Sequence, residues 1–138
     1  MEHYQFSFVA NMLQRYPNFD LEIKRAEYEA LHDREVFVDE NVGGGRAQYK
    51  ESRSIELMAI KLADNLRIKR LKMNQETIRT ALETTDPDTY SIIHDMYLVP
   101  YSTDTLESMA LKLSSSRPVV SRKRAKFFET IYTQLFTV

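Results

Sequence analysis

Apolar residues recur at helical spacing along most of this chain and predict an all-α protein. An α-helix has about 3.6 residues per turn, so side chains three or four positions apart lie on one face. Residues 3–15 follow this pattern, and Pro17 ends the helix because proline disfavours helical geometry at the preceding residue. Asn18 or Asp20 can cap a second, charge-rich helix that extends to about Asp33. These helices are expected to pair as an N-terminal helical hairpin or to bind another copy.

A longer apolar pattern runs from about residue 48 to residue 83 and predicts one long central helix, or two in series with a kink near Asn74. Four residues, spaced three, four and four positions apart, form a stripe that we expect to be buried: Ile55, Met58, Leu62 and Leu66. This stripe is longer than one small chain obviously needs to cover. A homodimer that uses it as a seam is therefore expected, and the alternative is a monomer that gains specificity from a neighbouring RNA polymerase.

Two short segments separate the hairpin from the long helix. Residues 35–38 have extended character, and four residues without a partner strand predict a connector rather than a sheet. Gly43–Gly45 includes every glycine of the chain. No Lys-Ser/Thr follows these glycines as in a P-loop, and the strand and helix that flank a dinucleotide-binding loop are missing. The glycines therefore predict a hinge and no nucleotide site.

The C-terminal third begins with a clear helix start. Asp86 can cap a helix over residues 89–98, because a side-chain oxygen at this position accepts a free backbone N–H group. The chain is thus expected to divide into an N-terminal helical region with its hinge (1–46), a central helix (47–85) and a C-terminal helical region (86–138).

Residues 102–135 have the pattern of a helix-turn-helix. The first helix is expected to start at a cap, Thr103 or Asp104, and the serines at 114–116 stop it. Pro118 suits the first turn of the second helix, where its missing N–H group would have had no partner. One side of the second helix is apolar, and it consists of Val120, Phe127, Ile131 and Leu135.

Charge is distributed unevenly along the chain. Residues 112–138 carry six Lys and Arg against Glu129 alone, a net of +5, so the other 111 residues sum to −6 within a total of −1. Five cations and no acid lie between Arg117 and Lys126. Like charges repel, so a polyanion would stabilise this segment, and in a helix-turn-helix the start of the second helix enters the DNA major groove. The alternative is an ordinary solvated basic face.

Other classes of function are not expected. The chain has no cysteine, and no apolar run approaches the length of a membrane span. Its first residues do not resemble a secretory signal, so a cytoplasmic protein without a membrane is predicted. His3, His32 and His94 are scattered, and Asp95 should point to a different side of its helix than His94. We therefore expect no metal, no cofactor and no enzymatic activity.

Two resemblances follow from these residues. Thr105–Ala110, then Leu113, then Ser116–Val120 resemble the DNA-binding region 4 of bacterial sigma factors. Ser114 stands where such turns often carry glycine, and Lys123 stands where the second helix is often apolar. The turn could thus differ in shape, and the helix could pack less deeply.

The wider chain, about residues 12 to 136, resembles the RinA-type family of bacteriophage late-gene transcription regulators, related to the ArpU group. The residues that carry this likeness are Tyr16-Pro17, Asn41–Gly45, Ile92-Ile93 and Tyr97. The resemblance implies a sequence-specific duplex DNA-binding protein that activates a phage late operon in the bacterial cytoplasm, with host RNA polymerase as a further partner. The alternatives are a DNA-packaging protein of the small-terminase kind and a helical protein-interaction module that acts on host RNA polymerase.

The sigma-like alignment and the helix phase together predict individual contacts. Arg117, Ser121 and Arg122 are expected to face base edges, and Lys126 is expected to meet a phosphate. The other predicted DNA-binding residues are Thr105, Ser116 and Arg124. A basic cluster on the central helix is a candidate for secondary contacts with the DNA backbone, with a solvated face as its alternative: Arg67, Lys69, Arg70 and Lys72.

Overall fold

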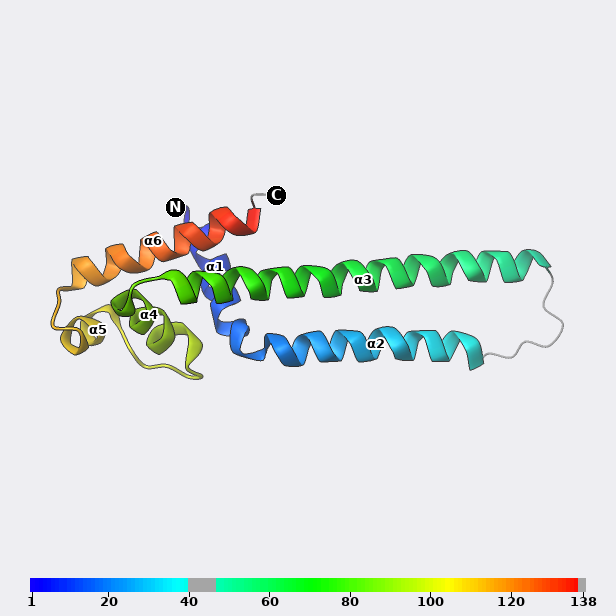
Figure 1. Cartoon of the computed structure of the whole chain (residues 1–138), viewed down its shortest axis with the longest axis horizontal. Helices are drawn as coiled ribbons and strands as arrows, with labels where there is room; N and C mark the ends of the chain where they lie inside the picture. The colour runs from blue at the N-terminus through cyan, green and yellow to red at the C-terminus, as the bar shows by residue number, and fades with distance from the viewer. Residues whose placement is uncertain (40–46, 137–138) are drawn as a thin grey trace. The chain divides into compact units, whose positions relative to one another are not determined.

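A computed structural model describes residues 1–39 and 47–136, and it describes side chains within residues 1–32 and 53–136. All regular structure in these ranges is helical, so the predicted all-α class is confirmed (Figure 1). In chain order the elements are α1 (His3–Arg15), η1 (Tyr16–Asn18), α2 (Phe19–Asp39), α3 (Ala47–Thr84), α4 (Pro87–Ile93), η2 (His94–Leu98), α5 (Leu106–Lys112) and α6 (Arg117–Phe136). The element η1 is a 3-10 helix and η2 is a π-helix.

The helices form two compact units. Unit 1 consists of Met1–Asn18 and Asn74–Val138, and unit 2 consists of Phe19–Met73. This division differs from the three consecutive segments that we expected, because unit 1 combines the two ends of the chain. The predicted hinge at Gly43–Gly45 lies outside the described residues. The chain passes from unit 2 to unit 1 within α3, next to Asn74, where the helix continues without a break.

The first helix belongs to unit 1, where its side chains pack on α6 and η2. Its buried face is formed by Val9, Met12 and Leu13, and the Phe6 ring lies 4.6 Å from the Phe128 ring. The expected N-terminal hairpin is therefore replaced by another arrangement: α1 covers α6, and α2 belongs to unit 2. Local periodicity could define both helices but not the choice of partner for each.

The core of unit 1 gathers buried apolar side chains from α1, the end of α3, α4, α5 and α6. The polar residue Thr89 is also buried, and its hydroxyl donates a hydrogen bond to Asp86 at 2.7 Å. Asp86 caps α4 as predicted, because its side chain also accepts the backbone N–H of Thr89 at 3.1 Å. The largest fully buried side chains of this core are Phe128, Leu13, Ile78, Ile92, Ile93, Met109, Ile131, Val9 and Val120.

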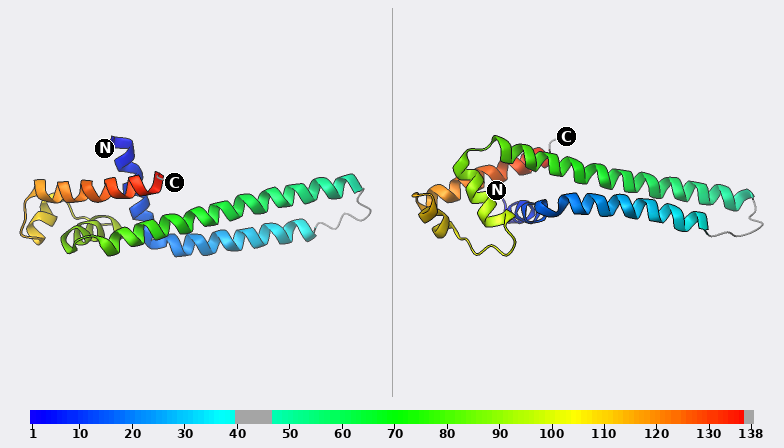
Figure 2. Two further views of the ribbon diagram at one scale, coloured as in Figure 1. Left: turned by 45° about the horizontal axis from the view of Figure 1, so that its top comes forward. Right: turned by 60° about the horizontal axis from the view of Figure 1, so that its bottom comes forward.

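In unit 2, α2 and the first part of α3 lie side by side and run in opposite directions (Figures 1 and 2). Two ion pairs join them: Arg67 to Glu29 at 3.1 Å and Lys72 to Glu27 at 3.3 Å. The buried face of α2 is formed by Phe19, Ile23 and Ala26.

One prediction for unit 2 is wrong. Residues 35–38 are not extended, since α2 continues to Asp39. Extending an existing helix costs little, so the weak extended preference of four residues is overridden. The stripe with Leu62 at its centre, expected to be buried, is exposed within this single chain, so its expected burial by a second copy stays a prediction. The half-buried positions of α3 in this unit lie on the opposite side of the helix, and they include Leu57, Ile60, Asp64, Ile68 and Leu71.

Candidate nucleic-acid interface

Helices α5 and α6 pack on each other and on α4 through a small apolar cluster. Ile92 of α4, Met109 and Ala110 of α5, and Val120 of α6 form its buried centre. The partly buried residues Met96, Leu106 and Leu113 surround them. This cluster fixes α6 against a short helix that precedes it by a four-residue connection.

Thr105 forms the cap of α5, one or two residues later than predicted. Its hydroxyl accepts the backbone N–H of Ser108 at 3.2 Å, and the Ser108 hydroxyl accepts the backbone N–H of Thr105 at 2.8 Å. This reciprocal pair satisfies two donors that a helix start leaves without partners. Thr105, predicted as a DNA contact, is therefore held by its own helix, although it is exposed.

A charged pair reinforces the same helix. Asp104 accepts hydrogen bonds from Lys112 at 2.8 Å and from the Ser108 hydroxyl at 2.9 Å. The Lys112 ammonium, and next the Ser108 hydroxyl, lower the pKa of Asp104, while Asp104 raises the pKa of Lys112. Lys112 also lies 3.6 Å from Asp95, whose other carboxylate oxygen contacts His94 Nδ1 at 3.0 Å. The expectation that His94 and Asp95 point to different sides is therefore wrong, because both lie in the π-helix and their side chains meet.

The turn between α5 and α6 has the geometry that usually requires glycine. Ser114 has a φ of 51°, in the left-handed region. The backbone N–H of Ser115 donates to the Ala110 carbonyl at 2.8 Å, and that of Ser114 donates to the Leu111 carbonyl at 3.3 Å. These two bonds form a Schellman motif, which satisfies free carbonyl groups at the end of α5. A serine at the glycine position thus leaves the turn in its usual shape, at a cost in backbone strain.

Helix α6 has one buried side and one exposed side. The buried side consists of Val120, Phe127, Phe128 and Ile131. The exposed side consists of Pro118, Arg122, Ala125, Lys126 and Glu129, and Ser121 is half-buried at its edge. Ser116 and Arg117 are exposed at the start of the helix, where the Ser116 carbonyl accepts the Val120 N–H at 3.1 Å.

Three of the five cations in the basic segment contact other side chains: Arg117, Lys123 and Arg124. Arg117 Nε lies 3.6 Å from the Glu107 carboxylate, and both side chains are largely exposed. Lys123 Nζ lies 3.2 Å from Asp88 and 3.8 Å from Asp86, at the start of α4. Lys123 therefore does not loosen the packing of α6, as its polar character suggested, because it connects α6 to α4. The two acids at the start of α4 were the sequence signal for this contact.

Arg124, which we expected to bind DNA, lies on the inner side of α6. Its guanidinium donates to the Tyr97 hydroxyl at 3.2 Å and lies 4.8 Å above the Phe6 ring, and its Nε is buried without a hydrogen-bond partner. Burial raises the pKa of Tyr97, and the nearby Arg124 charge offsets part of this effect. Arg124 thus joins α6 to η2 and α1, because position 124 shares the phase of Val120 on the helix, and its predicted contact with DNA stays a prediction.

Arg122 and Lys126 differ from the other three cations of the basic segment. Within the described part of the chain, they are the two exposed cations of α6 without a carboxylate within 4.0 Å; Arg124 has none either, but it is directed inward. Arg122 Nε donates to the Pro118 carbonyl at 3.3 Å, which leaves the other guanidinium donors available. The two residues are one turn apart on the exposed side, so they present adjacent positive charges to solvent.

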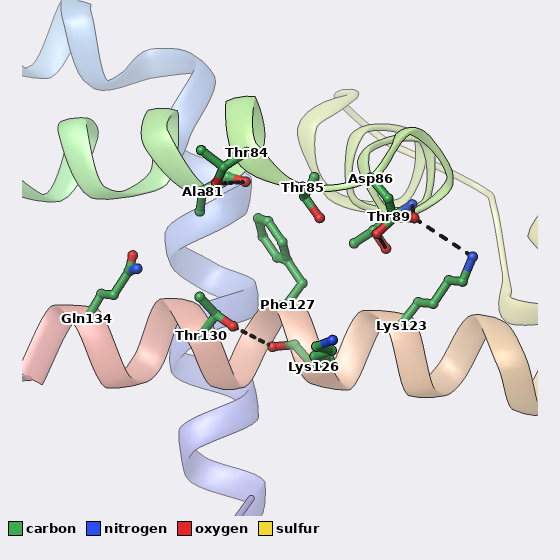
Figure 3. Close-up of a pocket in the computed structure, with 10 residues that line it drawn as sticks. All are labelled: Ala81, Thr84, Thr85, Asp86, Thr89, Lys123, Lys126, Phe127, Thr130 and Gln134. Carbon is green, nitrogen blue, oxygen red and sulfur yellow. Dashed lines mark hydrogen bonds and ion pairs between the residues drawn. The ribbon is translucent and has the colours of Figure 1, made fainter.

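A surface cavity of about 270 Å³ adjoins Lys126 (Figure 3). Figure 3 shows Phe127 projecting toward Ala81 and Thr84 while Lys123 reaches toward Asp86. The hydrogen bond from Thr89 lowers the pKa of Asp86, with a smaller contribution from Lys123. Two charged residues of the cavity wall therefore have structural roles: Asp86 caps α4, and Lys123 forms an ion pair with it. The lining residues are Ala81, Thr84, Thr85, Asp86, Thr89, Lys123, Lys126, Phe127, Thr130 and Gln134.

The predicted secondary contacts on α3 divide into two pairs. Arg67 and Lys72 are engaged with Glu29 and Glu27 of α2, as described above, so they help to hold unit 2 together. Lys69 and Arg70 are exposed on the same helix. All four cations belong to unit 2, whereas α6 belongs to unit 1.

A family model described as a protein of unknown function (DUF722) matches residues 10–133. The chain belongs to this family. Curated proteins yielded no match, and solved structures yielded none either. The DUF722 match includes α2 to α5 in full, the last six of the thirteen residues of α1 and most of α6, so it extends over both units.

Metal-binding and membrane-spanning features were also sought. Within residues 1–32 and 53–136, whose side chains are described, no group of three or more His, Asp or Glu is placed to hold a metal ion. No helix in the same ranges has both the length and the apolar character needed to cross a membrane.

Proposed function

We propose that α5, its turn and α6 form a helix-turn-helix that binds duplex DNA. The observation that carries this proposal is the pair of exposed cations, Arg122 and Lys126, one turn apart on α6 and without acidic partners in the described structure. The other cations of the segment have partners, so the positive charge is concentrated on one side of the helix. A row of phosphates is the partner that best neutralises such a surface.

The proposed docking places the first half of α6 in the major groove. Arg122 would donate its two remaining nitrogens to base edges, with guanine the favoured base because its O6 and N7 accept a bidentate arginine. Ser121 and Arg117 lie toward the same end of the helix and would read neighbouring bases. Lys126, one turn further on, would meet a phosphate. Arg117 can leave Glu107, because exposed ion pairs contribute only about 0–1 kcal/mol.

The finer proposal is transcription regulation. The resemblance to sigma region 4 and to RinA-type regulators supports a phage late-operon activator that acts beside host RNA polymerase in the bacterial cytoplasm. Such an activator must both bind a promoter and contact polymerase. The charge of the chain is unevenly distributed, because the C-terminal segment is basic and the remaining residues have a net charge of −6. We propose that the basic segment binds the promoter and that a surface elsewhere contacts polymerase.

Selection of bound sequences from a pool of random DNA duplexes tests the proposal, because the pool needs no assumption about the operator. The intact chain should enrich a sequence motif, and the double variant Arg122→Ala/Lys126→Ala should enrich none. Lys24→Ala removes an exposed cation from α2 and should enrich the same motif as the unchanged chain. A motif enriched equally by the double variant would contradict the assignment of α6. Absence of any motif for the unchanged, folded chain would contradict sequence-specific binding.

A further inference from the structure

Helix α3 has two apolar faces on opposite sides, and the structure accounts for only one. Its inner face, half-buried in unit 2, includes Leu57, Ile60, Ile68 and Leu71. At about 100° per residue, the outer stripe is centred roughly 180° away from this face. The outer stripe remains open to solvent: Ile55 is 67% exposed, Met58 69%, Leu62 61%, Leu66 58% and Met73 50%.

Five large apolar side chains in one row are unusual on a solvated helix. Singly exposed apolar residues are normal, but a contiguous row marks an interaction surface. The spacing of three, four, four and seven positions keeps the row on one side over about 27 Å of helix. In the described part of α2, three large apolar residues are exposed: Leu21, Tyr28 and Leu31. The α3 stripe contains five such residues, four of them within twelve positions, so it is the denser apolar surface among the described side chains of unit 2.

We infer that a second copy of this chain covers the α3 stripe, with the two α3 helices antiparallel and related by a twofold axis near Asp64. Twofold pairing requires one surface to be complementary to itself. In an antiparallel register centred on residue 64, Ile55 lies opposite Met73 of the second copy, and Leu62 lies opposite Leu66 of the second copy. Four of the five stripe residues therefore meet an apolar side chain in this register, and Met58 lies opposite Arg70.

Charge favours the same orientation. The exposed Lys69 and Arg70 border the C-terminal half of the stripe, whereas its N-terminal half has one exposed acid, Glu56, and one exposed cation, Lys61. A parallel dimer would place Lys69 and Arg70 beside their own copies, and like charges repel. In the antiparallel register, Arg70 lies opposite Met58 and Lys69 lies opposite Ala59, so their aliphatic stems can cover these two apolar side chains. The two basic pairs are then separated from each other along the helix axis.

These observations all lie within unit 2, so the inference does not depend on the proposed DNA binding. It adds an orientation and a register to the pairing of two copies that the sequence led us to expect. If two copies pair in this way, each assembly carries two copies of α6, and two readers can recognise two half-sites of an operator.

Cysteine cross-linking tests the register directly, because the chain has no cysteine of its own. Ile55→Cys and Met73→Cys are made in separate chains, mixed and oxidised. A disulfide needs Cα atoms within about 7 Å, so the antiparallel register predicts a 55–73 cross-linked dimer from the mixture. Ile55→Cys alone should not cross-link, since its two copies would be about 27 Å apart along the helix axis. Efficient cross-linking of Ile55→Cys alone, without a 55–73 cross-linked product in the mixture, would overturn the antiparallel arrangement.

Sedimentation velocity at micromolar concentration tests the pairing itself. The unchanged chain should sediment as a dimer, and Leu62→Glu should sediment as a monomer with unchanged helical circular dichroism. Ser54→Glu is the matched control, because Ser54 is exposed on α3 about 100° from the centre of the stripe, and it should remain a dimer. A monomeric mass for the unchanged chain, or a dimer that persists in Leu62→Glu, would overturn the inference. Sedimentation involves no DNA, so neither result depends on the proposed function.

Discussion

Lys123 and Asp88 connect the last helix to the start of α4, with Lys123 Nζ 3.2 Å from the Asp88 carboxylate. This contact changes the interpretation of the basic segment, because Lys123, a cation at its centre, holds two helices together. Arg124 is also directed inward, onto Tyr97 and Phe6. The surface available to an anion is therefore narrower than the sequence suggests, and it is centred on Arg122 and Lys126.

Replacement of Lys123 should separate stability from binding. We expect Lys123→Ala to lower the free energy of unfolding by about 0.5–1 kcal/mol, because the side chain is partly exposed and its ion pairs are screened by water. Affinity for the selected DNA should change less than twofold. Chemical denaturation and fluorescence anisotropy measure the two effects. A large loss of affinity at full stability would place Lys123 in the interface.

Arg124 should behave as a structural residue. Arg124→Ala removes a hydrogen bond to Tyr97 and the cation above the Phe6 ring, and we expect a loss of about 1–2 kcal/mol of unfolding free energy. Tyr97→Phe keeps the ring and removes only the hydroxyl, so it should cost about 1 kcal/mol or less. Both variants should retain DNA affinity under conditions in which they are folded. If the Arg124→Ala chain were folded but no longer bound DNA, Arg124 would have to contact the DNA.

The turn offers a stabilising change. Ser114 occupies the left-handed region, which costs a residue with a Cβ atom roughly 1–2 kcal/mol, whereas glycine adopts it freely. Ser114→Gly should therefore raise the thermal midpoint by about 2–4 °C. Ser115→Gly, at the next position, should not raise it. A midpoint that falls in Ser114→Gly would show that the turn differs from the Schellman geometry.

The cap of α4 should give a pH-dependent effect. The hydrogen bond from Thr89 holds the pKa of Asp86 below its ordinary value of 3.8. A lowered carboxyl pKa stabilises the folded state above the unfolded pKa, and this contribution is lost as the pH falls through the folded pKa. Asp86→Ala should cost about 1 kcal/mol at pH 7, and its difference from the unchanged chain should shrink below pH 4. Asp86→Asn, which can still cap the helix, should cost less at pH 7; equal losses would argue against the cap.

Sequence periodicity predicted the helices well where one apolar face was dominant. Residues 3–15 match α1 at both ends, and the pattern around Met109 and Val120 predicted how α5 and α6 pack. It did not identify the inner face of α3, because Leu57, Ile60, Ile68 and Leu71 form a second apolar set opposite the first. Two such sets look alike in sequence, and only the position of α2 distinguishes the inner one.

The candidate site shows a similar limit. A count of charges predicted a basic surface on the last helix, and Arg122 and Lys126 remain exposed on it. The count could not reveal that Lys123 meets Asp88 or that Arg124 meets Tyr97, because the partners are 35 and 27 residues away in sequence. Ion pairs between distant residues depend on tertiary packing, which local spacing does not encode.

The central claim is that α6 binds duplex DNA through Arg122 and Lys126, and the salt dependence of binding tests it most directly. Affinity for a selected duplex is measured by fluorescence anisotropy at several salt concentrations, for the unchanged chain, Arg122→Ala, Lys126→Ala and the control Lys24→Ala. We predict that Lys126→Ala weakens all sequences alike and lowers the slope of log K against log salt by about 1. Arg122→Ala should cost about 1–3 kcal/mol on the selected duplex and relax its sequence preference, and Lys24→Ala should match the unchanged chain. Equal affinity, preference and salt slope for all four chains would contradict the claim.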